Sequence, residues 1–393
     1  MSRFNADINR LRERKKRVLE GKFNCIPLRY KRFRKYLPGI EKERFIIITA
    51  NQKVGKSKLC DNMFVYDPLF FIMEHPEIKI KVLYFTLEMS PSAKRDEFMC
   101  YLLYRLDGIR ISPVDLRSTD QDKPVDEKIF ELLESERYEA YLDKFDEMVE
   151  FIEDERNPTG INKKCREYAL AHGHLNFTEV ETVDPLTNKV TKKRIVDPIN
   201  PYTPDDPEER MIAIIDNASN LQLESGMKKM DNIDKLAKYG ITLRNQLKYI
   251  FVLIQHQAQA QESVENQKYG RLKPSSDGLA DCKTTTRDAN MVIGLYSPFK
   301  HGIKDYEGYD ITKFRNFIRF MEVLEDRDYG AGGQVCPMWF DGATSYFDEL
   351  PLPDDKEGLE KMYAYLKRIT ATKTVKSFFI SSVKKIVKQF QKS

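Results

Sequence analysis

The segment Phe45–Lys58, FIIITANQKVGKSK, predicts the fold of this chain. It starts with apolar, mostly β-branched residues that are typical of a buried strand. The next residues, Ala50–Ser57, fit the phosphate-binding loop pattern G-x-x-x-x-G-K-[ST], with Ala50 at the first glycine position. A tight loop between a strand and a helix N-terminus points backbone N–H groups at phosphates. The alternative is a chance Gly-Lys-Ser, and the preceding strand argues against it.

The side chains of this loop suit a nucleoside triphosphate and Mg²⁺. Lys56 would reach the β- and γ-phosphates as an exposed loop cation, and the Ser57 hydroxyl would bind Mg²⁺. Ala50 is acceptable if its φ stays negative, because alanine is the smallest replacement for glycine. We therefore expect an NTPase. The predicted nucleotide-binding residues are Ala50, Asn51, Gln52, Lys53, Val54, Gly55, Lys56 and Ser57.

Composition and length suit a soluble protein with one large α/β domain and additions, or with two small domains. The chain has 393 residues, of which 41% are hydrophobic and 32% are charged. Its six cysteines form no C-x-x-C pair, so we expect reduced thiols in a cytoplasmic protein. No apolar run approaches the roughly 18 residues that would span a membrane, and no secretory signal is evident. We expect no membrane partner.

Charge is strongly segregated along the chain. Residues 1–44 hold 15 Lys and Arg against 5 Asp and Glu, and residues 356–393 hold 10 against 2. Basic ends around an acidic body suggest that the ends meet a polyanion or an acidic neighbouring subunit. Solvated basic tails without a partner are the alternative. We expect an N-terminal arm at 1–44, an ATPase domain at 45–350 and a basic helical tail at 351–393.

The N-terminal arm combines a charged helix with a basic-aromatic run. Residues 6–20 have a thin apolar stripe, which predicts a helix that docks on another subunit or on the body, with Gly21 as its end. Aromatic residues at 30, 33 and 36 alternate with basic ones. They could stack on nucleotide bases, but the spacing of three favours a helix that buries its aromatic side.

Acidic residues follow two further predicted strands. Residues 80–87 run into Glu88, which we expect to face the γ-phosphate as a general base, from a strand beside the phosphate-loop strand. Residues 211–216 end in Asp216, which would hold the Mg²⁺ shell. A solvent-facing glutamate at a strand end is the alternative for Glu88.

The next predicted strand, 249–254, runs into Gln255-His256-Gln257. His256 could sense the γ-phosphate, although a lone histidine is more often structural. The following segment, 257–288, is polar and has little periodicity, which suits contact with a nucleic-acid track. Among its cations, we predict that DNA is bound by Arg271, Lys273, Lys283 and Arg287.

Two stretches are expected to be insertions in the ATPase domain. Residues 107–157 hold 17 Asp and Glu against 7 Lys and Arg. The pattern of residues 94–156 predicts helices throughout. Residues 175–208 include a predicted β-hairpin at 177–196, with its turn at 184–188, and then a loop at 197–209. The first helix after the phosphate loop, 58–73, is expected to break near Pro68.

A last predicted hairpin, 317–324 with 335–340, presents one arginine, Arg327, in its glycine-rich connection. Arginine offers a rigid bidentate fork toward a phosphoryl group. Arg327 could therefore act on the nucleotide of a neighbouring subunit. Local pairing with Asp326 or Asp328 is the alternative.

The order of these motifs resembles the ATPase domain of DnaB-type replicative helicases, which belong to the RecA-like superfamily. The resemblance covers roughly 22–350 and rests on the phosphate loop, TLEMS at 86–90, IIDNASNLQL at 214–223, LIQHQ at 253–257 and Arg327. It implies an α/β fold: a RecA-like P-loop core with a mostly parallel sheet flanked by helices, a C-terminal β-hairpin and two insertions. The cofactors that it implies are ATP and Mg²⁺.

The resemblance also assigns roles and partners. It implies that Glu88 polarises water, that Asp216 is the Walker B acid, that His256 is the strand-tip sensor and that Arg327 is an arginine finger in trans. With Lys56, these would be the catalytic residues, and Ser57 and Asp216 would hold the metal. The expected partners are single-stranded DNA, further copies in a hexameric ring, and primase or other replisome proteins, in a bacterial or phage-infected cytoplasm.

The sequence departs from the family at Ala50 and at Glu325, where a second cation is usual, and no N-terminal primase-binding domain is evident, as in a phage-type architecture. These residues thus favour an ATP-driven DNA helicase for replication. A DNA-dependent RecA-superfamily ATPase for loading or recombination is one alternative. A slowly hydrolysing, ATP-regulated assembly protein is the other.

Overall fold

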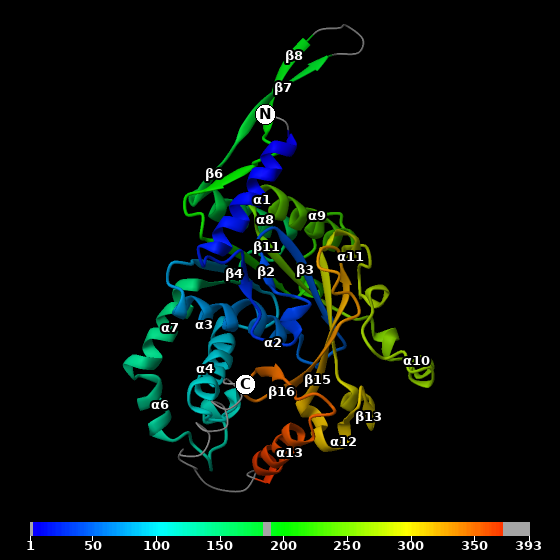
Figure 1. Ribbon diagram of the computed structural model, residues 1–393. Helices are drawn as coiled ribbons and strands as arrows, with labels where there is room; N and C mark the ends of the chain where they lie inside the picture. Colours follow the sequence, from blue (N-terminus) through cyan, green and yellow to red (C-terminus); the bar gives the residue numbers. More distant parts are fainter. Residues whose placement is uncertain (1–2, 184–189, 372–393) are drawn as a thin grey trace.

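A nine-stranded sheet forms the centre of the computed structural model, which describes residues 3–183 and 190–371 (Figure 1). Its strands lie in the order β17-β16-β15-β12-β3-β11-β10-β4-β5. The strands from β12 to β5 are parallel, and β15, β16 and β17 continue the sheet in antiparallel pairing. The prediction of a mostly parallel α/β sheet with a C-terminal hairpin is confirmed.

The parallel strands are apolar because both of their faces are covered. In β3 (Arg44–Ala50), every residue after Arg44 is buried, and the same holds for all of β10 (Arg210–Asp216) and β12 (Met291–Tyr296). The remaining parallel strands are β4 (Ile80–Thr86), β5 (Val149–Ile152) and β11 (Ile250–His256). The antiparallel strands are β15 (Ile318–Asp326), β16 (Val335–Asp341) and β17 (Tyr346–Glu349).

Alternate side chains of these strands enter two separate hydrophobic cores. Ile46 and Ile48 of β3 belong to the core that includes residues of α2, α3, α4 and α7, whereas Phe45 and Ile47 belong to the core under α8 and α9. The helices are α2 (Lys56–Asp61), α3 (Asp67–Glu74), α4 (Pro91–Asp107), α7 (Glu136–Met148), α8 (Pro158–Ala171) and α9 (Lys229–Leu247). The sheet is therefore the middle layer of three.

The helix after the phosphate loop does not break at Pro68. Pro68 lies in the first turn of α3, where its missing N–H costs no hydrogen bond. The irregularity comes earlier, as a π-helical turn at Asn62–Tyr66 between α2 and α3.

The acidic insertion, 107–157, is not helical throughout. It contains α5 (Pro113–Leu116), α6 (Glu127–Leu133) and α7, but then β5 joins the edge of the main sheet beside β4. Val149 and Ile152 of β5 are buried, which is the reason the chain leaves the helical pattern here.

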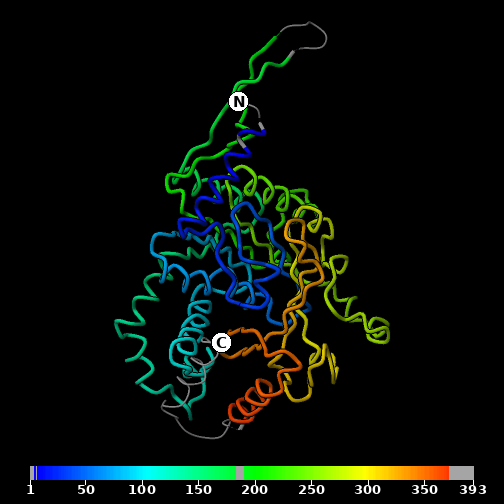
Figure 2. The backbone as a smooth tube through the Cα atoms, in the orientation of Figure 1, coloured from blue at the N-terminus to red at the C-terminus, as the bar shows by residue number. Residues whose placement is uncertain are grey.

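The second insertion carries a two-stranded arm, β7 (Phe177–Val183) with β8 (Val190–Val196), that projects from the body (Figures 1 and 2). The predicted hairpin is confirmed, and its predicted turn lies outside the described residues. The segment after it is not all loop, because β9 (Tyr202–Pro204) pairs with β6 (Gly173–Leu175) at the base of the arm. Tyr202 is fully buried and donates to the Ala169 carbonyl at 2.8 Å.

The N-terminal arm consists of α1 (Arg3–Leu19), β1 (Cys25–Pro27), a 3₁₀ turn at Phe33–Lys35 and β2 (Gly39–Glu41). Tyr30 and Phe33 are buried and Tyr36 is half exposed, so burial explains most of the aromatic spacing. The smaller elements are α10 (Val264–Lys268), α11 (Thr285–Asp288), β13 (Asp305–Tyr306), β14 (Tyr309–Asp310), α12 (Ile311–Phe314) and α13 (Lys356–Ala371), with 3₁₀ turns at 218–220, 259–262, 276–278, 298–301 and 315–317.

All six cysteines are free thiols. Among the helices of residues 3–183 and 190–371, none combines the length and apolarity that a membrane crossing requires. The predicted tail falls partly on α13, and its remainder lies outside the described residues.

Candidate functional site

The phosphate loop lies at the carboxyl edge of the parallel strands. Ala50 is the last residue of β3, and α2 begins at Lys56. Gly55 has φ +109° and Lys53 has φ +60°, so the loop turns through the left-handed region at both positions. Ala50 is absent from the residues with positive φ, which is the condition under which alanine can replace the usual glycine.

Lys56 is buried, so the expectation of an exposed loop cation is wrong. Its relative exposure is 6%, and among the described residues none forms a hydrogen bond or ion pair with its ammonium group. Burial lowers the pKa of Lys56 to about 8, against the attraction of Asp216 and Glu88. A buried cation without a partner is costly, and a phosphate at this loop would supply the missing anion.

Ser57 and Asp216 meet across the site, as the metal assignment requires. Ser57 Oγ donates to Asp216 Oδ1 at 2.9 Å, and Asp216 is buried at the end of β10. Mg²⁺ in nucleotide sites is held by one or two protein oxygens together with phosphate oxygens and water. A serine hydroxyl beside a buried carboxylate is such a donor set, so these residues fit Mg²⁺. When bound, the ion would neutralise phosphate charge.

Glu88 is at the same edge but not on the neighbouring strand. Strands β11 and β10 lie between β3 and β4, so the expected adjacency of the two strands is wrong. Glu88 is exposed, and Asn217 Nδ2 donates to its Oε2 at 2.5 Å. This bond orients the carboxylate beside Asp216 instead of leaving it free in solvent.

His256 also lies at the carboxyl edge of the sheet, because it pairs in register with Ala50, the last residue of β3. Burial lowers the pKa of His256 to about 4, and Lys56 adds to that effect. The imidazole is therefore neutral near pH 7. Its Nδ1 is buried and has no hydrogen-bond partner among the described residues, which leaves one polar atom at the strand tip free to respond to a ligand. The neighbouring Gln255 instead bonds the carbonyls of Ala280 and Cys282.

Two residues that contact and support the phosphate loop belong to no recognisable sequence motif. Arg319 is fully buried in β15 and donates from Nε to the Val54 carbonyl at 2.7 Å, with further bonds to Asn316. Burial lowers the pKa of Arg319 to about 9. Phe340 of β16 lies against Gly55, where an added Cβ would approach its ring to 3.2 Å. Only the antiparallel strands bring these residues to the loop, so sequence spacing could not reveal them.

The polar segment 257–288 contacts the phosphate loop directly. Asn51 Nδ2 donates to the Leu272 carbonyl at 3.2 Å. Lys300 donates to the Gln52 carbonyl at 3.0 Å and also forms an ion pair with Glu262. The loop and this segment are thus joined from both sides.

The four cations predicted to bind DNA are all exposed, but the structure does not gather them. Arg271 and Lys273 flank Leu272, near the phosphate loop, and Lys273 forms a 3.0 Å ion pair with Glu322. Arg287 lies near the opposite edge of the sheet, where its carbonyl accepts from Arg327. Lys283 lies between these two positions along the segment. The DNA-binding role of these four residues stays a prediction.

Arg327 lies at the edge opposite the phosphate loop. Its backbone N–H donates to Asn290, which precedes β12, and Asn290 in turn bonds Phe45 at the start of β3. A seven-residue strand is about 20 Å long, at roughly 3.3 Å per residue, so Arg327 is distant from its own phosphate loop.

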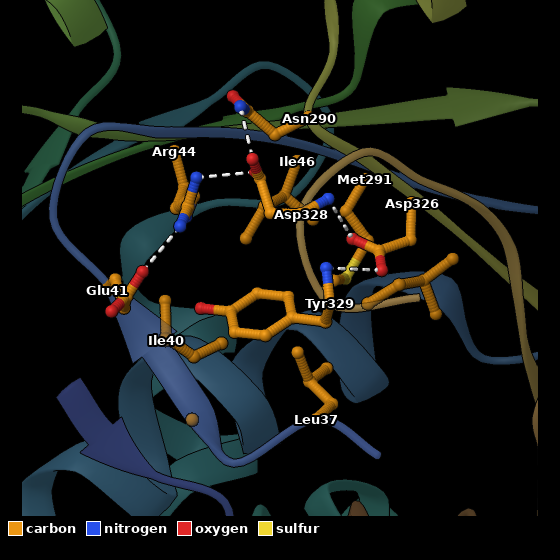
Figure 3. Close-up of a pocket in the computed structure, with 12 residues that line it drawn as sticks. Leu37, Ile40, Glu41, Arg44, Ile46, Asn290, Met291, Asp326, Asp328 and Tyr329 are labelled. Atoms are coloured by element: carbon orange, nitrogen blue, oxygen red, sulfur yellow. Dashed lines mark hydrogen bonds and ion pairs between the residues drawn. The ribbon is translucent and has the colours of Figure 1, made fainter. Parts of the chain in front are cut away.

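The carboxylates beside Arg327 are occupied by other groups (Figure 3). Asp326 accepts backbone N–H groups of Tyr329 and Ala331, each at 2.8 Å. Asp328 pairs with Arg44 at 2.5 Å. The Arg327 guanidinium, which is exposed, bonds the Arg287 carbonyl instead. Local pairing with Asp326 or Asp328, the alternative considered for Arg327, does not describe this hairpin.

Comparison with known proteins places the fold. A solved ATPase domain of another protein superposes with a TM-score of 0.60 at 11% identity, over 88% of this chain and 99% of that domain. A DnaB-like replicative helicase, solved in a study of its interactions with primase, gives 0.56 at 13% identity, over 83% of this chain and 63% of that chain. The fold of this chain is therefore similar to that of the solved ATPase domain and of the DnaB-like helicase. No family model and no curated protein sequence matches the chain.

The first prediction concerns the buried charge of Lys56. Lys56→Met should abolish nucleotide binding and leave the melting temperature of the nucleotide-free protein unchanged or higher. Because the folded pKa lies below the unfolded one, near 10.4, the charged form weakens the fold below about pH 8. That penalty fades as pH rises from the folded to the unfolded pKa. Thermal melts at pH 7 and pH 10.5 measure it, and a lower melting temperature of the variant at pH 7 would contradict it.

Proposed function

We propose that this chain is an ATP-driven DNA helicase of the DnaB type that works as a ring of identical subunits. The observation that carries the proposal is that the residues assigned to one ATPase site lie at two edges of the subunit. Lys56, Ser57, Glu88 and Asp216 lie at the carboxyl edge, and Arg327 lies at the other. Copies arranged head to tail would bring the two edges together at every interface.

At each interface, the chain's own residues would divide the work. The Lys56 ammonium and the loop N–H groups would hold the phosphates, and Ser57 and Asp216 would hold Mg²⁺. Glu88, oriented by Asn217, would accept a proton from the attacking water. The likeness in fold to the solved ATPase domain and to the DnaB-like helicase supports this assignment of roles.

The N-terminal helix supports assembly into a ring. Five large apolar side chains of α1 are exposed, with relative exposures from 45% to 78%: Phe4, Ile8, Leu11, Val18 and Leu19. Its last turns are held to the body by Arg17, which bonds Glu208 at 2.5 and 2.8 Å. Such an apolar face normally covers another surface, and a neighbouring copy is the partner that a ring requires.

The contacts of segment 257–288 support coupling between DNA and hydrolysis. A polyanion bound by Arg271 and Lys273 would act next to the Leu272 carbonyl that holds Asn51. The same contact could transmit strain from the phosphate loop to the segment. We infer that single-stranded DNA stimulates the ATPase. Unwinding of a forked duplex tests the helicase itself, and stimulation without unwinding would favour a DNA-dependent ATPase that does not separate strands.

Glu88→Gln should lower ATP turnover by about 10²–10⁴-fold, the usual size of a general-base effect. The amide oxygen can still accept from Asn217, so nucleotide binding and assembly should persist. Steady-state hydrolysis and fluorescent-nucleotide binding measure the two effects. Glu74→Gln, on the exposed end of α3, is the matched control. Wild-type turnover in the Glu88 variant would remove this residue from the site.

DNA affinity should be salt-dependent, and Arg271→Ala/Lys273→Ala should make the slope of log K against log salt shallower by about two contacts. The Lys273–Glu322 ion pair would have to open on binding. As a control, Lys144→Ala/Lys163→Ala removes two surface lysines that also pair with glutamates, on α7 and α8. Titration of labelled oligonucleotide at several salt concentrations gives the slopes. Equal slopes in all three proteins would move the DNA site elsewhere.

Arg327→Ala and Lys56→Met proteins should each be inactive alone but regain partial activity when mixed. In a mixed ring, some interfaces join an intact phosphate loop to an intact Arg327, and such arginines contribute about 10³–10⁵ in rate. ATP turnover at several mixing ratios, with size analysis of the mixture, measures the effect. Mixed assemblies that stay at the baseline rate would show that Arg327 does not act across the interface.

A further inference from the structure

Lys94 is a buried cation for which the proposed roles leave no task. It lies in the first turns of α4, and its side chain is 3% exposed. Lysine is rarely found in such a place unless it is paired. The ammonium group donates to Asp61 Oδ2 at 2.9 Å and to the Tyr84 hydroxyl at 2.8 Å, and it lies 3.3 Å from Asp216 Oδ2. Burial opposes the charge, but the Asp61 and Asp216 carboxylates prevail and raise the pKa of Lys94.

The two oxygens of Asp216 therefore face different partners. Oδ1 accepts from Ser57, on the side of the phosphate loop. Oδ2 lies beside the Lys94 ammonium group and 3.0 Å from the Tyr84 hydroxyl, in the core behind the loop. Asp61 Oδ1, at 2.8 Å, competes for the single proton of that hydroxyl. Rotation of the carboxylate would break a buried hydrogen bond and a buried ion pair together. Both contacts are costly to lose in an interior.

Lys94 also links the elements that carry the other site residues. Asp61 ends α2, the helix that begins at Lys56, and α4 begins just after Glu88, with Ser90 as its N-cap. One ammonium group thus holds together the phosphate-loop helix, the end of β10 and the helix after the candidate base.

We propose that Lys94 is a positioning residue, which fixes the Asp216 carboxylate with one oxygen turned toward Ser57 and the metal. This inference rests on the proposed function, because it presumes that Mg²⁺ and nucleotide bind there. It adds a group behind the Walker acid that no phosphate-loop pattern contains. Lys94 would not contact the ligand itself. It would act through Asp216 on a divalent cation that is bound with a nucleotide.

The test separates orientation of Asp216 from simple stability of the fold. Lys94→Met/Asp61→Asn removes one positive and one negative charge, so the buried cluster keeps its net charge. Two variants serve as controls. Asp61→Asn alone leaves the ion pair between Lys94 and Asp216 in place. Arg95→Met changes the next residue of α4, whose ion pair with Asp146 lies at the surface. The probe is binding of a fluorescent ADP analogue, measured in chelator and in a Mg²⁺ titration.

In the double variant, the Mg²⁺ concentration for half-maximal tightening of nucleotide binding should rise about tenfold or more, the usual effect of losing an outer-shell partner. Nucleotide affinity in chelator should stay within about twofold of wild type, since the phosphate loop is intact. Asp61→Asn and Arg95→Met should both behave as wild type does.

Three results would overturn the role of Lys94. The first is an unchanged Mg²⁺ requirement in the double variant. The second is a lower Mg²⁺ requirement, which would mean that Lys94 only competes with Mg²⁺ as a positive charge. The third is an equal loss of nucleotide affinity with and without Mg²⁺. If the double variant does not fold, Tyr84→Phe removes the hydroxyl that Asp216 Oδ2 and Asp61 Oδ1 share, without altering charge. It should shift the Mg²⁺ requirement in the same direction by less, and no shift would overturn the proposal. Failure of the wild-type protein to bind nucleotide would refute the proposed function instead.

Discussion

The hydrogen bond between Ser57 and Asp216 joins residues 159 positions apart, and the candidate site depends on it. It exists because β3 and β10 are parallel strands of one sheet and end at the same edge. Parallel strands require long connections, so the chain can insert whole elements between them without moving this edge. The acidic segment with β5 and the β7–β8 arm are such insertions.

Buried charge is the second constraint at this edge, and the chain satisfies it in two ways. Lys94 is surrounded by acceptors that its own fold supplies, and we propose that it orients Asp216. Lys56 has no such acceptor among the described residues, and burial lowers its pKa to about 8. Arg319 satisfies its buried guanidinium with backbone carbonyls, including one in the phosphate loop. Of these three cations, Lys56 is the one without a partner among the described residues, and a bound phosphate group would supply that partner.

Sequence reasoning predicted the parts of the site that follow from local pattern. The phosphate loop and Asp216 each adjoin a continuous apolar strand, and strand ends are where such patterns are strongest. It failed where the answer depends on strand order or distant contacts. The separation of Glu88 from β3 by two intervening strands, the burial of Lys56 and the support from Arg319 all arise from neighbours far along the chain. Tyr202 lay in a segment rich in proline and aspartate, whose composition concealed a short strand.

The measurement that tests the account most directly is the structure of the assembled protein with a non-hydrolysable ATP analogue, Mg²⁺ and single-stranded DNA, determined by electron cryomicroscopy. We predict a closed or helical ring with nucleotide at each interface. In it, the Arg327 guanidinium of one subunit would lie within hydrogen-bond distance of the γ-phosphate held by Lys56 and Ser57 of the next. An assembly in which Arg327 faces solvent while nucleotide fills the phosphate loop would contradict it.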